Sequence, residues 1–112
     1  MDRLETFDDF WPFYVAQHSR ATTRAWHFAG TTFVLASLAA GVAVTPSLAL
    51  LAPVVGYGPA WIGHFFFEKN RPATFTHPLW SLRGDFRMYR LMLTGRMGPE
   101  VERARRLYPG PA

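Results

Sequence analysis

The sequence lacks cysteine and, through its centre, every charged side chain. With no cysteine among its 112 residues, the chain cannot form a disulfide or bind a metal through thiolates. No Asp, Glu, Lys or Arg occurs from Ala25 to Phe67, whereas both flanks are densely charged. A soluble helical domain of this size needs polar residues on its outer faces, so an uncharged run of this length indicates a lipid environment.

Positive charge comes almost entirely from arginine. The formal net charge is +4, and Lys69 is the only lysine. The arginines lie beside the apolar run without a nucleic-acid recognition motif, so we expect membrane lipid and no nucleic acid as the partner of this charge. The first residues are acidic where an export signal would be basic, which predicts that no cleavable signal is present.

The apolar run contains two segments of membrane-spanning length. Residues 24–44 and 48–67 are separated by the only turn signal in the run, at 45–47. Twenty helical residues extend about 30 Å, which is enough to cross a hydrocarbon core. Breaks between Pro53 and Pro59 interrupt the second segment, as occurs in membrane helices where neighbouring protein satisfies the freed carbonyls. The pattern predicts a transmembrane helical hairpin.

Shorter helices are predicted on both sides of the hairpin. Asp9 is a suitable N-cap for a helix over residues 10–18, because Pro12 then falls in the first turn. Apolar residues recur every three or four positions over 78–94, with arginines mainly on other faces, which indicates a helix on the membrane surface. A last helix is expected over 99–107.

We therefore predict the all-α class and one membrane domain, residues 1–112. The chain would be a small integral membrane protein whose transmembrane hairpin is flanked by amphipathic interfacial helices. The hairpin turn carries no arginine or lysine, and those beyond the two segments flank its open end, so both termini should be cytoplasmic. Small residues such as Ala36 and Ala40 can serve the hairpin itself or a homo-oligomer.

The predicted hairpin brings all four histidines to one level. His27 and His64 are equally far from the turn, one on each side, so antiparallel packing places both near the cytoplasmic interface. His18 ends the preceding helix at that level, and His77 precedes the surface helix there. Polar groups at this depth are costly unless they are partnered, which makes them functional candidates.

Convergence of four histidines predicts a metal site, although a single interfacial histidine is more often a hydrogen-bonded structural residue. Imidazole suits zinc, copper, iron and nickel, and the spacing does not choose between iron and zinc. Two alternatives stay open at this point. One is a haem protein with His27 and His64 as axial ligands, and the other is a non-catalytic membrane hairpin or scaffold.

Three stretches resemble the Mpo-like family. Residues 18–31, HSRATTRAWHFAGT, are similar to its first motif. Residues 63–73, GHFFFEKNRPA, are similar to its second motif, Gly-His-x-x-x-Glu-Lys-x-x-Pro-Ala. Residues 78–88, PLWSLRGDFRM, are similar to the short bacterial members. The resemblance extends over most of the chain between residues 10 and 95.

The characterised fungal members of that family are iron(II)-dependent dioxygenases of the endoplasmic reticulum that shorten 2-hydroxy fatty acids by one carbon in α-oxidation. The resemblance implies a similar reaction here, with a 2-hydroxy fatty acid and dioxygen as substrates and Fe(2+) as cofactor. It implies iron ligands at His18, His27 and His64, which match the motifs, with His77 as a fourth. It also implies a bacterial cytoplasmic membrane, with the metal site on the cytoplasmic side.

The same resemblance implies roles for four charged residues. Glu68 and Asp85 would orient the N–H groups of the ligands, and Arg24 or Arg71 would steady the substrate carboxylate. The acyl tail would lie along the hairpin beside the break between residues 56 and 59. Without an enzymatic role, Glu68 would simply pair with Arg24 or Arg71. The hairpin turn is shorter than in the fungal proteins, which leaves the substrate chain length open.

Overall fold

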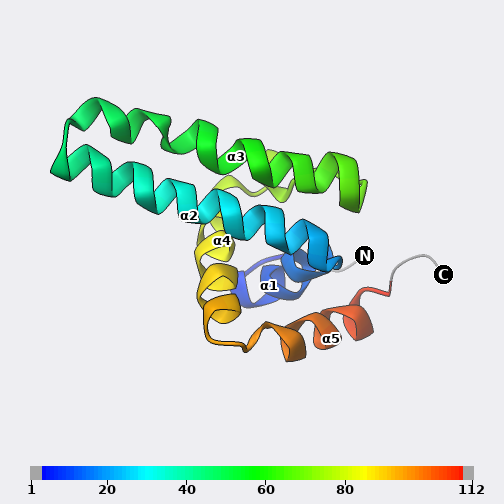
Figure 1. The fold of residues 1–112 in the computed structure, drawn as a ribbon. Coiled ribbons are helices and arrows are strands. Elements are labelled where there is room, and N and C mark those ends of the chain that lie inside the picture. Colours follow the sequence, from blue (N-terminus) through cyan, green and yellow to red (C-terminus); the bar gives the residue numbers. More distant parts are fainter. Residues whose placement is uncertain (1–3, 110–112) are drawn as a thin grey trace. The chain divides into compact units, whose positions relative to one another are not determined.

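A computed structural model describes residues 4–109, which form helices and connecting turns with no strand among them (Figure 1). The prediction of an all-α chain is confirmed. The α-helices are α1 (Phe7–Ala16), α2 (Ala21–Ala43), α3 (Ala52–Ile62), α4 (Pro78–Leu93) and α5 (Met97–Leu107). Short 3₁₀ segments form η1 (Pro46–Leu51) and η3 (Ala73–Phe75), and η2 (Gly63–Glu68) is a π-helical turn.

The chain divides into two compact units. The hairpin unit is residues 20–69, and the flanking unit combines residues 1–19 with residues 70–112. Hydrogen bonds join the separate halves of the flanking unit. The side-chain amide of Asn70 donates to the carbonyl of Gln17 at 3.0 Å, and Arg105 donates to the carbonyl of Ser19 at 2.9 Å.

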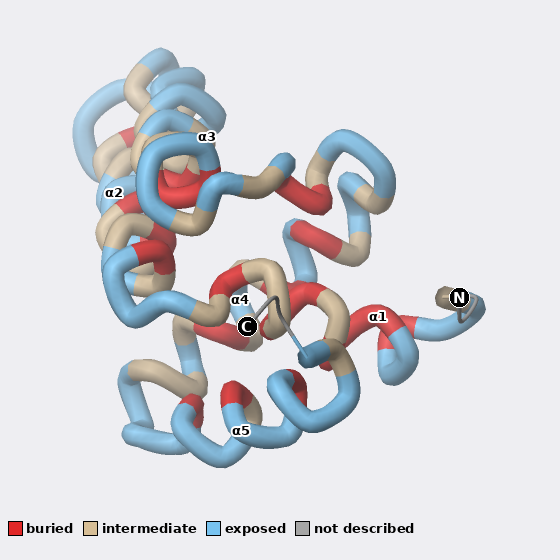
Figure 2. Tube along the Cα trace, turned by 90° about the vertical axis from the view of Figure 1, so that its right-hand side faces the viewer, coloured by how far each residue is buried: buried red, intermediate tan, exposed pale blue. Residues whose placement is uncertain are grey.

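The hairpin unit carries its apolar side chains on the outside. α2 and α3 lie side by side, and Figure 2 shows them mostly exposed or half-buried. Ala21–Ala43 and Pro46–Glu68 are each 23 residues and apolar enough to cross a membrane, yet only 17% of either apolar window is buried. The core helix of a soluble protein would be mostly buried. Here Val42, for example, is 91% exposed, and apolar side chains with such exposure are suited to contact with lipid.

The helices of the hairpin approach closely at small residues. A Cβ added at Gly30 would lie 2.7 Å from the carbonyl oxygen of Gly56, and one added at Gly56 would lie 2.6 Å from Val34 Cγ2. At this level the backbones are too close for an acyl chain to pass between them. A substrate tail beside the break near Pro59 would therefore have to lie on the outer surface of the hairpin.

Gly30→Ala should loosen the hairpin, because the new methyl group would meet a backbone atom that has no easy way to move. Overpacking of this kind costs about 1–3 kcal/mol. Gly58→Ala is the matched control, since a Cβ there meets nothing within 4 Å. We expect Gly30→Ala to lower the thermal midpoint in detergent and Gly58→Ala to leave it unchanged or raise it. Equal midpoints for the two variants would contradict close packing at Gly30.

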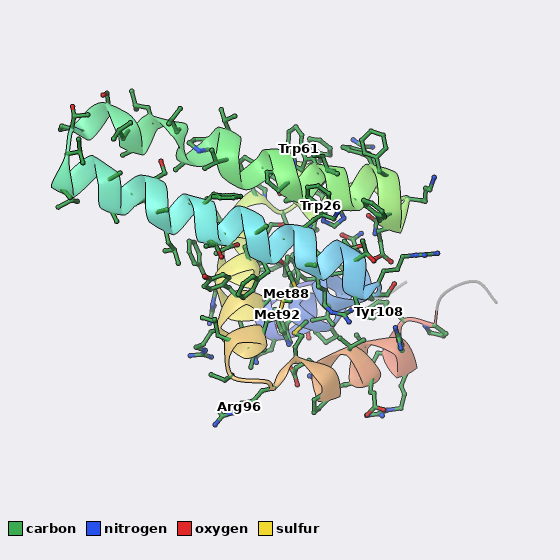
Figure 3. The ribbon with its side chains drawn as sticks, viewed as in Figure 1. Trp26, Trp61, Met88, Met92, Arg96 and Tyr108 are labelled. Atoms are coloured by element: carbon green, nitrogen blue, oxygen red, sulfur yellow. The ribbon has the colours of Figure 1, made fainter. Side chains whose placement is uncertain are left out.

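The flanking unit packs around the aromatic face of α1. Its buried core consists of Phe7, Phe10, Trp11, Tyr14, Val15, Ala73, Met88, Met97, Val101 and Ala104. Met92 packs against this core beside Met88, and Figure 3 labels both on α4. Gly84 allows α4 to approach the ring of Tyr14, since a Cβ there would lie 3.1 Å from the ring. The Trp11 indole N–H donates to Glu100 Oε1 at 2.6 Å.

α1 begins three residues before the predicted start at residue 10. Thr6, rather than Asp9, is the N-cap, and its hydroxyl accepts from the Asp9 N–H at 3.2 Å. Pro12 consequently lies inside the helix. The earlier start adds the buried ring of Phe7 to the core, and burying one such ring contributes roughly 1.5–3 kcal/mol. That gain is comparable with the cost of an interior proline, ~3 kcal/mol.

The remaining predicted helices are all present. The segment predicted over 48–67 is formed by η1, α3 and η2 together, Pro46–Glu68. The ends of this run and of α2, α4 and α5 lie within three residues of those predicted over 48–67, 24–44, 78–94 and 99–107.

Candidate metal centre

His27 and His64 meet inside the hairpin unit. His27 lies in the second turn of α2 and His64 in η2, and both are buried. Their ring centroids are 5.4 Å apart and their planes are perpendicular, at 89°. The equal distances of the two residues from the hairpin turn thus do place them at one level. Two imidazoles brought together in this way can bind one metal ion if a third ligand is within reach.

The local backbone explains how His64 reaches His27. Gly63 packs tightly on α2, because a Cβ there would lie 3.2 Å from both the Thr23 carbonyl oxygen and Trp26 Cβ. His64 is the second residue of the π-helical turn η2, and the C-cap residue of this turn, Lys69, has the left-handed conformation with φ 64°. The Lys69 N–H donates to the carbonyl of His64. Isolated π-helical turns often occur at functional sites, and this one carries a buried imidazole.

Glu68 ties the end of η2 to the start of α2. Its Oε1 accepts from the Arg20 backbone N–H at 2.9 Å and from the Thr23 hydroxyl at 2.8 Å. Arg20 is the N-cap of α2 but makes no side-chain capping bond, so the Glu68 carboxylate supplies the acceptor at this helix terminus. α2 therefore begins at Ala21, three residues before the predicted start. Through these bonds Glu68 fixes the spacing between the helical segments that carry His27 and His64.

His18 belongs to the flanking unit and is held by the last turn of α1. Its Nδ1 lies 2.6 Å from the carbonyl oxygen of Tyr14, and its ring stacks on the Tyr14 ring at 4.2 Å. A carbonyl only accepts hydrogen bonds, so Nδ1 carries the proton, and in neutral imidazole the lone pair is then on Nε2. A metal-binding histidine commonly has its other nitrogen fixed by such a carbonyl. His18 is thus set to offer Nε2 as a ligand atom.

Asp85 is connected to His18 through Tyr14. The Tyr14 hydroxyl donates to Asp85 Oδ1 at 2.5 Å, while the Tyr14 carbonyl holds His18. The residue pattern does not indicate this role for Tyr14. Its position four residues before His18 was the only local signal, and the pairing with Asp85 joins residues 71 positions apart. Burial, followed by the nearby Asp85 carboxylate, raises the pKa of Tyr14 well above its usual range.

Asp85 should give the protein a characteristic dependence of stability on pH. Burial raises the pKa of Asp85 from 3.8 to about 7, against the opposing effect of the Tyr14 hydrogen bond. Between these values the folded chain holds a proton that the unfolded chain releases, so Asp85 lowers stability as pH rises through this window. Each unit of pKa difference between the folded and unfolded chain corresponds to about 1.4 kcal/mol, so Asp85 should change the free energy of unfolding by a few kcal/mol at most.

Asp85→Asn should remove this contribution, because the amide oxygen can still accept from Tyr14. We expect the variant to gain thermal stability over the parent as pH rises from about 4 to about 7, measured by circular dichroism in detergent. Asp8→Asn, at an exposed carboxylate of α1, is the control. If the difference in thermal stability between the parent and Asp85→Asn does not change with pH, the Asp85 carboxyl has the same pKa in the folded and the unfolded chain.

His77 lies apart from these interactions, as the N-cap residue of α4. It is half-buried, its Nδ1 lies 2.8 Å from the Thr76 hydroxyl, and its ring stacks parallel on Trp80 at 5.6 Å. Phe10 contacts the same ring at 5.2 Å. These contacts give His77 a structural position in the flanking unit whether or not it also binds metal.

The two arginines assigned to the substrate carboxylate lie in different units. Arg24 is in the first turn of α2, half-buried and three residues before His27. Arg71 is exposed, with its guanidinium 5.3 Å from the centre of the Phe75 ring.

The donor set suits a metal ion. His18, His27 and His64 are buried, and three buried imidazoles could hold a metal. Cysteine is absent, so the ligands are nitrogen donors of intermediate softness, which suit iron, zinc, copper and nickel. The fixed Nδ1–H of His18 matches what a metal-bound histidine requires. The residues present therefore fit an iron(II) ion.

A family model described as 2-hydroxy-palmitic acid dioxygenase Mpo1-like matches residues 4–97. That range includes all four histidines together with Glu68 and Asp85. Searches of curated proteins and of solved structures find no significant match. Because the family model covers most of the chain, the protein belongs to the 2-hydroxy-palmitic acid dioxygenase Mpo1-like family.

Proposed function

We propose that this chain is an iron(II)-dependent dioxygenase that oxidatively shortens 2-hydroxy fatty acids by one carbon at a membrane, as in fatty-acid α-oxidation. The observation that carries the proposal is the buried contact between His27 and His64 in a hairpin whose helices could cross a membrane. The description of the family supplies the substrate class and the use of dioxygen. A histidine pair alone would support only a metal site.

His18 is proposed as the third ligand because the chain keeps it near the pair. Only Ser19 and Arg20 separate it from the first residue of α2. His27 lies six residues beyond that helix start, about 9 Å at ~1.5 Å per residue. The three ligands would thus come from the end of α1, from α2 and from η2. The proposed ligand set does not need His77, whose Nδ1 and ring have the partners described above.

The residues around the ligands would provide orientation. The Tyr14 carbonyl holds the His18 proton on Nδ1, and Asp85 holds the Tyr14 hydroxyl. Glu68 keeps η2 against the start of α2. When bound, iron(II) would supply the redox chemistry with dioxygen that cleavage of the C1–C2 bond requires. The burial of His18, His27 and His64 would limit the access of water to that chemistry.

Substrate recognition would use the charge and the apolar surface of the hairpin unit. Arg24 lies one helical turn from His27, so its guanidinium is the nearer of the two candidates along the chain for the substrate carboxylate, ahead of Arg71. The acyl tail would run along the outer surface of the hairpin, since Gly30 and Gly56 close the space between the helices. A membrane-dissolved fatty acid could reach such a site without entering water.

We further propose an integral membrane location with both termini and the metal site on the cytoplasmic side. Arginine and Lys69 flank the open end of the hairpin, and its turn carries neither residue type.

The haem alternative is less compatible with the histidine geometry. The rings of His27 and His64 are in edge-to-face contact, which leaves no space for a porphyrin between them. Absence of a Soret band from purified protein would agree with a simple iron site.

Iron quantification combined with oxygen uptake tests the proposal. Full-length protein purified in detergent should bind about one iron(II) per chain and consume oxygen when 2-hydroxypalmitate is added. Palmitate, which lacks the 2-hydroxyl group, is the matched control and should cause no uptake. Protein that binds no metal but retains its fold would instead favour a non-catalytic hairpin.

A further inference from the structure

α4 presents an apolar stripe and a basic stripe side by side on its exposed face. Leu79 and Leu93 are 79% and 61% exposed, and Leu82 and Phe86 lie between them on the same face. At 100° per residue, Arg83, Arg87 and Arg90 follow along one edge of this stripe. The opposite face, with Ser81, Gly84 and Met88, is the buried one. The apolar stripe therefore cannot be explained by the core of the flanking unit.

Two of these arginines are held in place by aromatic rings of α1. The Arg83 guanidinium lies 4.1 Å from the centre of the Phe7 ring, and that of Arg87 lies 4.5 Å from the Trp11 ring. Such contacts restrict the side chains and leave guanidinium N–H groups available to an acceptor. Within residues 4–109, none of Arg83, Arg87 and Arg90 makes an ion pair. Their positive charge is thus held in place without a carboxylate partner.

Between them the arginines and Phe86 line a surface hollow. Arg83, Phe86, Arg87 and Arg90 line an open hollow of about 410 Å³ on α4. Guanidinium groups converging on a hollow suit a phosphate oxygen cluster, which they can bind bidentately. The aromatic ring of Phe86 in the same hollow, and the exposed leucines of the neighbouring stripe, suit the first carbons of acyl chains. A soluble phosphate has no apolar part that could contact these side chains.

A short stretch of chain links α4 to the second candidate membrane span. Only residues 69–77 separate α4 from the end of the second apolar helical run, at Glu68. Nine residues reach about 30 Å even when fully extended. A surface helix tethered this closely to a membrane span meets lipid headgroups before other partners.

We propose that the outer face of α4 is a binding site for the phosphate headgroup of an anionic phospholipid. Arg83, Arg87 and Arg90 bind the phosphate, and the stripe of Leu79, Leu82, Phe86 and Leu93 enters the acyl region of the same leaflet. This site anchors the flanking unit to an anionic membrane surface and does not depend on the proposed oxidation reaction.

Lipid binding to the full-length chain tests the proposal. Protein in a neutral detergent is titrated with phosphatidylglycerol or phosphatidylcholine, and bound lipid is counted by native mass spectrometry. The parent should prefer phosphatidylglycerol tenfold or more, since each arginine near the surface contributes about fivefold. The triple variant Arg83→Gln, Arg87→Gln, Arg90→Gln should lose this preference. No preference in the parent, or an unchanged preference in the triple variant, would overturn the proposal.

The matched control removes the same charge elsewhere in the flanking unit. Arg96→Gln, Arg103→Gln and Arg106→Gln together change exposed residues at or beyond the α4–α5 turn, and Figure 3 shows Arg96 extending away from the ribbon. This variant should keep the preference for phosphatidylglycerol. If both triple variants lose the preference for phosphatidylglycerol equally, net charge alone causes the preference, and the proposed site is overturned.

Two further measurements keep the test decisive. If the triple variant loses its far-ultraviolet circular dichroism, Arg90→Gln replaces it, because the guanidinium of Arg90 has no aromatic contact within the described residues. That single change should lower the preference about fivefold, and an unchanged preference contradicts the proposal. Inorganic phosphate is then added to the lipid-bound parent. It should fail to displace phosphatidylglycerol at equal concentration, and full displacement would point to a soluble phosphate ligand instead.

Discussion

Replacing His64 with alanine is expected to remove bound iron and to lower turnover of a 2-hydroxy fatty acid by more than about 100-fold. Loss of a residue that merely orients a metal ligand typically costs 10–100-fold, and loss of a ligand should cost more. His64 is buried against the ring of His27, so no water-exposed group can replace it without rearrangement. Iron content by inductively coupled plasma mass spectrometry and oxygen uptake measure the two effects.

His77→Ala is the matched control for this prediction. Its ring is half-buried, stacks on Trp80 and has Thr76 as the partner of Nδ1. We expect this variant to keep its iron, with at most a modest loss of thermal stability. A folded His64→Ala variant that retains iron and turnover would remove His64 from the ligand set. Loss of iron in His77→Ala, with its circular dichroism unchanged, would restore His77 as a fourth ligand.

Glu68→Ala should weaken both the hairpin and its affinity for metal. The substitution leaves the N-terminus of α2 without its carboxylate acceptor, and an N-cap acceptor contributes about 0.5–2 kcal/mol. It also leaves the hydroxyl of Thr23, a fully buried residue, without its hydrogen bond to Glu68, which costs a further ~1–3 kcal/mol. Because η2 would no longer be tied to α2, iron affinity should fall by about 10–100-fold.

Two variants separate this effect from a change of charge alone. Glu68→Gln retains an acceptor oxygen and should recover much of the stability and iron affinity. Glu102→Ala removes an exposed carboxylate of α5 and should change neither quantity. The quantities to compare are thermal midpoints in detergent and iron dissociation constants from competition with a chelator. A Glu68→Ala variant indistinguishable from the parent in both would show that this carboxylate has no role in positioning η2.

The hairpin and the meeting of His27 with His64 could be predicted because both depend on patterns that the chain carries locally. An uncharged run of spanning length, one turn signal and equal distances from that turn are sufficient to place two residues at one level. The π-helical turn that begins at Gly63 had no such signal. It depends on the close approach of that glycine to α2, which is a property of the packed helices rather than of the residue pattern.

The polar connections of the site were harder to predict, because they join residues far apart in sequence. Glu68 lies 45 positions from Thr23, and Asp85 lies 71 positions from Tyr14. The resemblance to the Mpo-like family drew attention to both carboxylates but could not name their partners. The start of α1 was misplaced for a related reason. The rule against an interior proline is local, whereas the burial of Phe7 that offsets it depends on a core to which residues distant in sequence contribute.

Analysis of the reaction product tests the proposed function most directly. Iron-loaded, full-length protein is incubated with 2-hydroxypalmitate and oxygen, and the fatty acids are identified by mass spectrometry. We predict the acid one carbon shorter, in an amount that matches the oxygen consumed, and no product from palmitate or from the His64→Ala variant. Recovery of unchanged 2-hydroxypalmitate from protein that retains its iron and its fold would contradict the proposed dioxygenase function.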